Sequence, residues 1–264
     1  MSSAVIAIIG GSWSGALLSG ISVEEQIELT TPYGDPSSPI VRAIYNDQPI
    51  YLLHRHGTPH SILPHKINYR ANIWALSQLK VNTIVAIATC GGIRPSLGPG
   101  SILIPDQLID YTWGRESTFL DGSEGQIGHL EMTHPYCSQL RDALIRAAKH
   151  VNVAVVNGGV YGITQGPRFE TPAEIDRMDK DGADVVGMTG MPEAALAAEK
   201  SICYATVNLI VNPAAGRADS AIGISQIEQA CELGYERLNR LLAETLAIVN
   251  STNHMKPDST VMWM

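Results

Sequence analysis

Six short runs rich in Val, Ile and Ala recur along the chain, and patterns typical of helices lie between them. Several of these runs show no polar alternation, which is typical of strands buried on both faces of a sheet. The expected strands are residues 4–9, 50–54, 83–88, 153–156, 184–188 and 203–211. Residues 67–79 and 140–148 repeat apolar side chains along one helix face. This alternation predicts an α/β fold with a largely parallel sheet flanked by helices.

Local signals mark where two helices begin. In a capping box, a hydroxyl and a carboxylate three residues apart each accept a hydrogen bond from the other residue's backbone N–H. This spacing occurs at Thr171 with Glu174 and at Ser225 with Glu228. Pro172 then stands at the first position of the earlier helix, where its missing N–H costs nothing. We therefore expect helices to follow both positions.

The chain length fits one domain. With 264 residues, 45% of them hydrophobic, the chain can bury a sizeable core, and α/β folds of this length are commonly one unit. We expect the domain to cover residues 1–250 and residues 251–264 to form a polar tail. Residues 111–132 are polar and glycine-bearing, which predicts a functional or interface loop.

Charge and apolar content exclude several classes of protein. The formal net charge is -8 with no block of Lys or Arg, which argues against nucleic-acid binding. Residues 4–9 have the length of a buried strand and no basic leader, and no apolar run is long enough for a bilayer. Wide spacing favours free buried thiols over disulfides or a metal site for Cys90, Cys137, Cys203 and Cys231. A cytoplasmic enzyme is expected.

The turn after the first strand is rich in small residues. Gly10-Gly11-Ser12-Trp13-Ser14-Gly15 could close its amides and hydroxyls around an oxyanion, because ligands of open α/β sheets bind beyond the carboxyl ends of strands. The turn lacks the spacing of a dinucleotide fingerprint and the lysine of a triphosphate loop. A plain strand-to-loop turn remains the alternative.

Histidines cluster after the second of these strands. His54, His56 and His60 surround Arg55, and a metal-dependent hydrolase is one interpretation of such a group. No nearby carboxylate completes a ligand set, and a guanidinium opposes a dication. An arginine beside a histidine suits a phosphate better, because its planar fork matches phosphate oxygens.

Two further strand ends carry polar or small residues. Thr89 precedes Cys90 and a pair of glycines, and Thr189 follows the 184–188 strand. If these strands are neighbours, one phosphate would be held by hydroxyl, guanidinium and imidazole donors from Ser12, Arg55, His56 and Thr189.

With these residues in hand, the chain resembles the trimeric purine nucleoside phosphorylases, which include the methylthioadenosine and methylthioinosine phosphorylases, over nearly its whole length. The matching motifs are the Gly-Gly-Ser turn, RHGTPHSILPHKINYRANIWAL from Arg55, GPRF from Gly166 and GADVVGMTGMPEAALA from Gly182. The resemblance implies a single α/β domain with a partly barrel-like sheet. It also implies a pentosyltransferase that replaces a purine on ribose with inorganic phosphate, without metal or organic cofactor.

By this resemblance the same four residues form the phosphate site. Met188 would contact the ribose and Phe169 the purine, with base recognition by Glu170 and by the Asn212-Pro213-Ala214 stretch. The implied catalytic groups are Asn212, Glu170 and His56. Ile224 would lie near the sugar's 5′ substituent. His129 would reach the site of a neighbouring subunit, in a homotrimer or a dimer of trimers.

The base-recognition residues depart from those of adenine-specific relatives, which look like two aspartates around a tyrosine. Asn212 can donate to a purine oxygen and accept from the adjacent ring nitrogen, whereas aspartate only accepts. Glu170 resembles the carboxylate of the 6-oxopurine enzymes, although a helix N-terminal acid is the structural alternative. The expected reaction converts S-methyl-5′-thioinosine to hypoxanthine and 5-methylthioribose 1-phosphate in purine salvage. Inosine or guanosine, and then S-methyl-5′-thioadenosine, are the alternative substrates.

Overall fold

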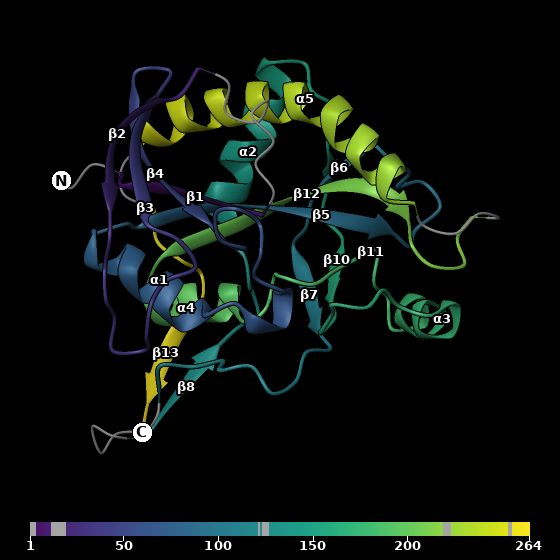
Figure 1. The fold of residues 1–264 in the computed structure, drawn as a ribbon, viewed down its shortest axis with the longest axis horizontal. Helices are drawn as coiled ribbons and strands as arrows, with labels where there is room; N and C mark the ends of the chain where they lie inside the picture. The colour runs from purple at the N-terminus through teal and green to yellow at the C-terminus, as the bar shows by residue number, and fades with distance from the viewer. Residues whose placement is uncertain (1–3, 12–19, 121, 123–126, 219–222, 253–254) are drawn as a thin grey trace.

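The computed structural model describes residues 4–11, 20–120, 122, 127–218, 223–252 and 255–264 and confirms the α/β prediction (Figure 1). The elements up to the long middle loop are β1 (Ile6–Gly10), β2 (Ser22–Ile27), β3 (Ile40–Tyr45), β4 (Gln48–His54), η1 (Pro64–Lys66), α1 (Tyr69–Gln78), β5 (Thr83–Gly92), β6 (Ile102–Ile104) and β7 (Gln107–Asp110). They are followed by β8 (Gly128–Glu131), α2 (Ser138–His150), β9 (Val156–Asn157), β10 (Val160–Ile163), α3 (Pro172–Lys180), β11 (Val185–Gly187), α4 (Glu193–Glu199), β12 (Cys203–Pro213), α5 (Ile224–Ser251) and β13 (Thr260–Trp263).

One sheet organises the described part of the chain. Its strands follow the order β2-β3-β4-β1-β5-β11-β10-β7, and it branches where β12 pairs with both β5 and β6. Strands β4, β1, β5 and β12 run parallel to one another, while β2 and β3 form antiparallel pairs at one edge and β11 is antiparallel to β5. The sheet is therefore mixed and largely parallel, as predicted.

A gap opens along one edge of β5. Strand β1 pairs with β5 as far as Ile9 and Ala86, and β11 pairs with it only at Gly91 and Gly92. Between Ala86 and Gly91, no described strand pairs with β5 on this side. Two halves of the sheet thus diverge at its centre.

Helices cover both faces of the sheet, as Figure 1 shows. Helices α2 and α5 pack on one face in the first core cluster, and α1 and α4 pack on the other face in the second. The strands alternate between them: Ile6 and Ile8 of β1 join the first cluster, and Ala7 and Ile9 join the second. The continuous apolar runs of the sequence follow from this burial on both faces.

The helix signals were correct at one site and wrong at the other. Thr171 caps α3 with a reciprocal Thr171–Glu174 capping box, and Pro172 is the first helical residue. Helix α5 instead begins at Ile224, with Gly223 as its N-cap and no side-chain cap. Ser225 is therefore inside the first turn, where its hydroxyl cannot take the N-cap role. The expected strand at 153–156 is also shorter, because only Val156 and Asn157 form β9.

The middle loop and the tail are tied to the domain. Arg115 donates to the backbone oxygens of Thr164, Gln165 and Met191, so the loop is held against the segments that flank β10 and β11. The loop ends in β8, which pairs with β13 of the tail (Figure 1). The predicted division of the chain at residue 250 stays a prediction.

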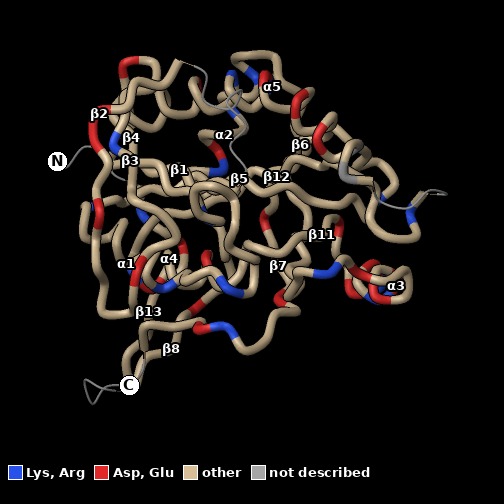
Figure 2. The backbone as a smooth tube through the Cα atoms, in the orientation of Figure 1, with Lys and Arg blue, Asp and Glu red and all other residues tan. Residues whose placement is uncertain are grey.

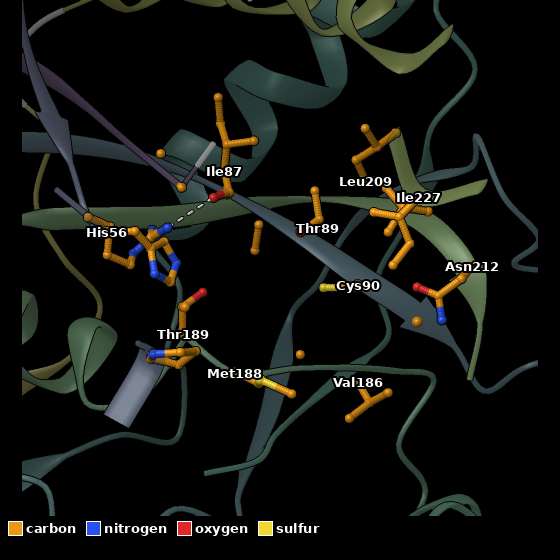
Figure 3. A pocket seen from close by; sticks show the side chains of 18 of the residues that line it. His56, Ile87, Thr89, Cys90, Val186, Met188, Thr189, Leu209, Asn212 and Ile227 are labelled. Carbon is orange, nitrogen blue, oxygen red and sulfur yellow. Dashed lines mark hydrogen bonds between the residues drawn. The ribbon is translucent and has the colours of Figure 1, made fainter. Parts of the chain in front are cut away.

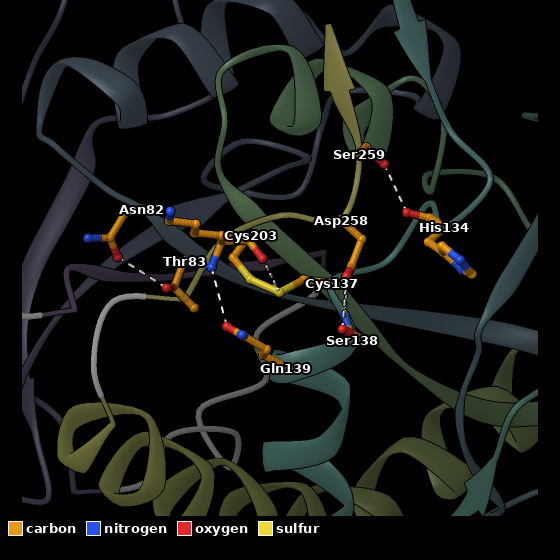
Figure 4. Close-up of a disulfide and its surroundings, with 10 residues drawn as sticks. Asn82, Thr83, His134, Cys137, Ser138, Gln139, Cys203, Asp258 and Ser259 are labelled. Carbon is orange, nitrogen blue, oxygen red and sulfur yellow. Dashed lines mark hydrogen bonds between the residues drawn. A yellow bond between two sulfur atoms is a disulfide. The ribbon is translucent and has the colours of Figure 1, made fainter.

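The expectation of free thiols is confirmed for two cysteines and wrong for two. Cys90 and Cys231 are free and buried, whereas Cys137 and Cys203 form a disulfide (Figure 4). The sequence separation of 66 residues hides this contact, because only folding brings the start of α2 beside the start of β12. The bond links these two elements.

Charged residues are spread over many elements. Figure 2 shows Lys and Arg interspersed with Asp and Glu along the tube, including on α3. No helix among the described residues combines the length and apolar character that crossing a membrane requires.

Candidate active site

A cavity of about 320 Å³ lies where the sheet opens beside β5. Its wall includes the unpaired edge of β5, from Ile87 to Gly91, together with the ends of β1, β4 and β11. Helix α5 closes it from the other side through Ile227, Tyr235 and Leu238. The divergence of the two half-sheets thus provides a concave site at the strand ends, where the sequence placed it.

Arg55 is fixed at one end of this cavity. Its guanidinium is 1% exposed and pairs with Glu193, at 2.6 Å from Nε to Oε2 and 2.8 Å from Nη2 to Oε1. Nη1 donates to the backbone oxygen of Ile87 at 3.2 Å. Burial alone would lower the pKa of Arg55, but the charge and hydrogen bonds of Glu193 raise it above its ordinary value. The site therefore holds a permanent cation.

His56 lies beside Arg55 and is neutral at pH 7. Its Nδ1 is 2.7 Å from the backbone oxygen of Ile62, which can only accept, so Nδ1 carries the proton. Burial, with the positive charge of Arg55 and the neighbouring His60, lowers the pKa of His56 to about 4. Its ring stacks on that of His60, with centroids 4.3 Å apart.

This low pKa predicts a pH-dependent stability. Because the ordinary pKa is 6.5, the unfolded chain gains a proton at His56 as pH falls from about 6.5 to about 4, while the folded chain does not. Stability is therefore lost on acidification. We expect the free energy of unfolding, measured in urea without phosphate, to fall between pH 7.5 and 5 in both proteins. The fall should be roughly 2 kcal/mol smaller for His56→Gln than for the unmodified chain. Parallel stability curves would contradict this. His54 is present in both proteins, so its titration cancels in the comparison.

The other predicted phosphate ligands surround the same end. Thr189 is 8% exposed and lines the cavity, and in Figure 3 it lies on the same side as His56. Gly11 lies against the His56 ring, since a Cβ there would come 3.2 Å from its Cδ2. Ser12 lies outside the described residues.

The predicted base-binding residues lie at the opposite end. Figure 3 shows Asn212 far from His56, with Thr89 and Met188 between them. Asn212 is 7% exposed, and its Nδ2 donates to the backbone oxygen of Pro213 at 2.6 Å. Its Oδ1 and second N–H stay available for a ligand. Pro213 itself is not among the lining residues, and its role is that of acceptor for Asn212.

Glu170, Phe169 and Ala214 also line the cavity. Glu170 Oε1 accepts from the hydroxyl of Thr164 at 2.5 Å, which orients the carboxylate. Glu170 directly precedes Thr171, the N-cap of α3, and Glu174 is the acid of the capping box. Phe169 is 50% exposed, so its ring is free to pack on a planar base.

Two predicted 5′-subsite residues are not placed in the cavity. The side chain of Ile224 lies outside the described part of the chain, although the neighbouring Ile227 of α5 lines the cavity. His129 is exposed on β8, pairs with Met262 of β13 and does not line this chain's own cavity. Its service to a neighbouring subunit stays a prediction.

Sequence reasoning missed several residues of the site. Glu193 and Tyr204 were not predicted. Glu193 is a carboxylate in an alanine-rich segment with no motif, and its partner Arg55 is 138 residues away in the sequence. The cavity residues of α5 were not predicted, because their helical spacing is also typical of a helix face that packs on the core. Thr89, which the sequence marks as a polar residue near a strand end, is the one exposed residue of the otherwise buried β5 and lines the cavity.

A metal site was the alternative interpretation of the histidine cluster. Among the residues that the structure describes, no group of three His, Cys, Asp or Glu side chains could hold an ion, and these include His54, His56 and His60. What the arrangement offers instead is a cation and neutral donors at one end of a cavity and an amide and a carboxylate at the other. Such a pair of ends suits an anion and a polar heterocycle in one site.

Comparison with known proteins places the chain in a family. The model of the phosphorylase superfamily matches residues 5–247. A "Probable S-methyl-5′-thioinosine phosphorylase" of Pseudomonas syringae is 44% identical over 92% of this chain and 98% of its own length. A 6-oxopurine nucleoside phosphorylase of Pyrococcus furiosus is 41% identical over 92% of each chain.

Solved structures agree with this placement. Methylthioadenosine phosphorylase of Schistosoma mansoni, in complex with adenine, superposes with a TM-score of 0.89 at 29% identity, over 95% of this chain and 93% of that one. A methylthioadenosine phosphorylase from an Antarctic soil metagenomic library gives a TM-score of 0.87 at 34% identity, over 96% and 89% of the two chains. The family match, the relatives and the shared fold all agree: this chain belongs to the phosphorylase superfamily.

Proposed function

We propose that this chain is a purine nucleoside phosphorylase that cleaves 6-oxopurine nucleosides with inorganic phosphate, with S-methyl-5′-thioinosine as the preferred substrate in purine salvage. The observation that carries the proposal is the cavity with Arg55 and His56 at one end and Asn212 at the other, which Glu170 also lines. The curated relatives named for S-methyl-5′-thioinosine and for 6-oxopurine nucleosides support the substrate class.

The phosphate end supplies the nucleophile. Arg55 brings a permanent charge, Thr189 and Ser12 bring hydroxyls, and Nε2 of neutral His56 accepts a hydrogen bond from a protonated phosphate oxygen. The glycosidic bond breaks through a state with positive charge on the sugar. Bound phosphate stabilises this cation and then attacks it, so no covalent enzyme intermediate is required.

The base end stabilises the leaving group. As the bond breaks, negative charge grows on the purine, and Asn212 donates its second N–H to the 6-oxo group. Glu170 accepts from the protonated nitrogen of the six-membered ring. A 6-amino group would meet a donor instead of an acceptor at Asn212, so adenine nucleosides fit less well.

The apolar wall of α5 favours a methylthio group at the sugar's 5′ position. Ile227 and Leu238 line the cavity together with Val211, and burial of a methylthio group there is favourable, whereas a hydroxyl would lose its water. Ordinary inosine or guanosine phosphorolysis is the second candidate. It would be favoured if this wall tolerated a 5′ hydroxyl equally well.

Three further properties belong to the proposal. The enzyme works without metal or organic cofactor, because phosphate itself is the nucleophile. It acts in the cytoplasm, where nucleosides and phosphate are both present. It assembles as a homotrimer, or as a pair of trimers, in which His129 of one subunit completes the site of the next.

The proposal is tested by release of free base from methylthioinosine, inosine and methylthioadenosine, each with and without phosphate. We expect fast, phosphate-dependent cleavage of methylthioinosine. Preferred cleavage of inosine would assign a general salvage role, and preferred cleavage of methylthioadenosine would overturn the assignment of the base site. Cleavage that ignored phosphate and was lost with a chelator would reveal a metal-dependent hydrolase.

A further inference from the structure

The guanidinium of Arg55 is held in one orientation by its hydrogen bonds. It is buried against Glu193, the first residue of α4, which is 0% exposed. The two groups meet in a bidentate pair, and the hydroxyl of Tyr204 donates to the same carboxylate at 2.9 Å. Tyr204 is itself buried on β12. Three elements, the end of β4, the start of α4 and β12, thus converge on one charged group.

The hydrogen bonds of the guanidinium show which edge is left for a ligand. A guanidinium carries five N–H groups. In Arg55 the Nε–H and one N–H of Nη2 donate to Glu193, and one N–H of Nη1 donates to the backbone oxygen of Ile87. One N–H remains on Nη1 and one on Nη2. The remaining N–H of Nη2 lies at the end of the fork, and together with that of Nη1 it can donate to the oxygens of a phosphate.

We propose that Glu193 and Tyr204 are positioning residues, which clamp the side edge of the Arg55 guanidinium so that its end edge is presented to inorganic phosphate. The proposal rests on the proposed function, because it assigns phosphate to the Arg55 end of the cavity. An arginine side chain free to rotate has several rotamers and binds phosphate only in some of them. Because the clamp already holds one rotamer, phosphate binding does not have to restrict the arginine side chain, which would cost free energy.

The charge of Glu193 has a second consequence for binding. An unpaired buried guanidinium would hold an anion very tightly, whereas Arg55 paired with Glu193 forms a neutral unit that binds through directed N–H groups. Phosphate affinity in this protein therefore depends on the direction of the fork. Disturbing that direction should weaken phosphate binding and leave nucleoside binding, at the other end of the cavity, unchanged.

Tyr204→Phe is the decisive variant, because it removes one hydrogen bond to Glu193 and leaves the ion pair in place. We expect the KM for phosphate to rise about 5- to 10-fold, with the KM for nucleoside unchanged within about 2-fold. Glu193→Asp keeps the charge but shortens the clamp, and we expect a rise of more than about 10-fold in the same constant. Calorimetric titration of inorganic phosphate should show the same weakening.

Tyr136→Phe is the matched control. Tyr136 is buried and stacks near Tyr204, with ring centroids 6.2 Å apart, but its hydroxyl has no hydrogen-bond partner in the described structure. Its loss should leave the KM for phosphate unchanged. If both tyrosine variants behave alike, or if Tyr204→Phe lowers kcat and leaves the KM for phosphate unchanged, the clamp is merely structural and the proposal is wrong.

The unmodified enzyme separates this proposal from the proposed function. If base release by the unmodified enzyme does not depend on phosphate, the proposed function fails. If release depends on phosphate but Tyr204→Phe has the phosphate KM of the unmodified enzyme, the clamp alone fails. Should Glu193→Asp not fold, Tyr204→Phe still decides, because the Arg55–Glu193 pair stays intact in it.

Discussion

Asn212→Ala is expected to lower kcat for methylthioinosine by about 10²- to 10³-fold, because a preorganised donor to the leaving group contributes roughly that much. The variant also leaves the Pro213 carbonyl without its 2.6 Å partner, which should cost only about 1 kcal/mol of stability. Steady-state kinetics and urea unfolding measure the two effects on one preparation. Equal loss of activity and stability would contradict the assigned role.

Asn212→Asp is the shape-matched companion of this variant. Aspartate offers only acceptors, so it repels the 6-oxo group and accepts from a 6-amino group. We expect cleavage of methylthioinosine to fall at least as far as in Asn212→Ala, while the ratio of methylthioadenosine to methylthioinosine cleavage rises. An unchanged ratio would mean that Asn212 does not read the base.

Arg55→Leu is expected to abolish measurable phosphorolysis and to destabilise the fold by about 3–5 kcal/mol, because it leaves the Glu193 carboxylate buried without its partner. The double variant Arg55→Leu with Glu193→Leu should recover most of the stability and none of the activity, since an apolar pair replaces the ion pair. Thermal unfolding and base release measure this contrast.

The exposed pair of Arg168 and Glu174 provides the control for that experiment. Its Nη2 and Oε1 atoms are 2.6 Å apart, and the two side chains are 67% and 44% exposed. Because water screens such pairs, Arg168→Ala should leave the free energy of unfolding nearly unchanged. A cost for Arg55→Leu as small as this would contradict the assignment of a buried, coupled pair.

The sequence predicted the strands well because their residues report burial directly. Continuous runs such as residues 4–9 and 203–211 appear apolar because both faces are covered, and the structure confirms β1 and β12 there. Polar residues at strand ends were equally readable, so Arg55, His56 and Thr189 were brought together correctly. These inferences needed only local pattern and one rule about parallel sheets.

The remainder required contacts between distant parts of the chain. The Cys137–Cys203 bond and the Arg55–Glu193 pair join segments separated by 66 and 138 residues, and nothing in local composition marks either partner. At Ser225 the spacing of a capping box is present, but the helix begins at Ile224, two residues before the start that a Ser225 cap would give. The N-cap is the residue before the first helical residue, and the packing of the whole domain determines where the helix begins.

The divergence of the sheet beside β5 also bears on how such enzymes change over time. The ends of β4 and β11 carry Arg55, His56 and Thr189, which are assigned to the shared co-substrate, and β12 carries Asn212, which is assigned to the variable base. Substitutions that retune one specificity therefore fall on different strands from those that would damage the common chemistry. Point changes on β12 can therefore shift the base preference while the phosphate-binding residues stay unchanged.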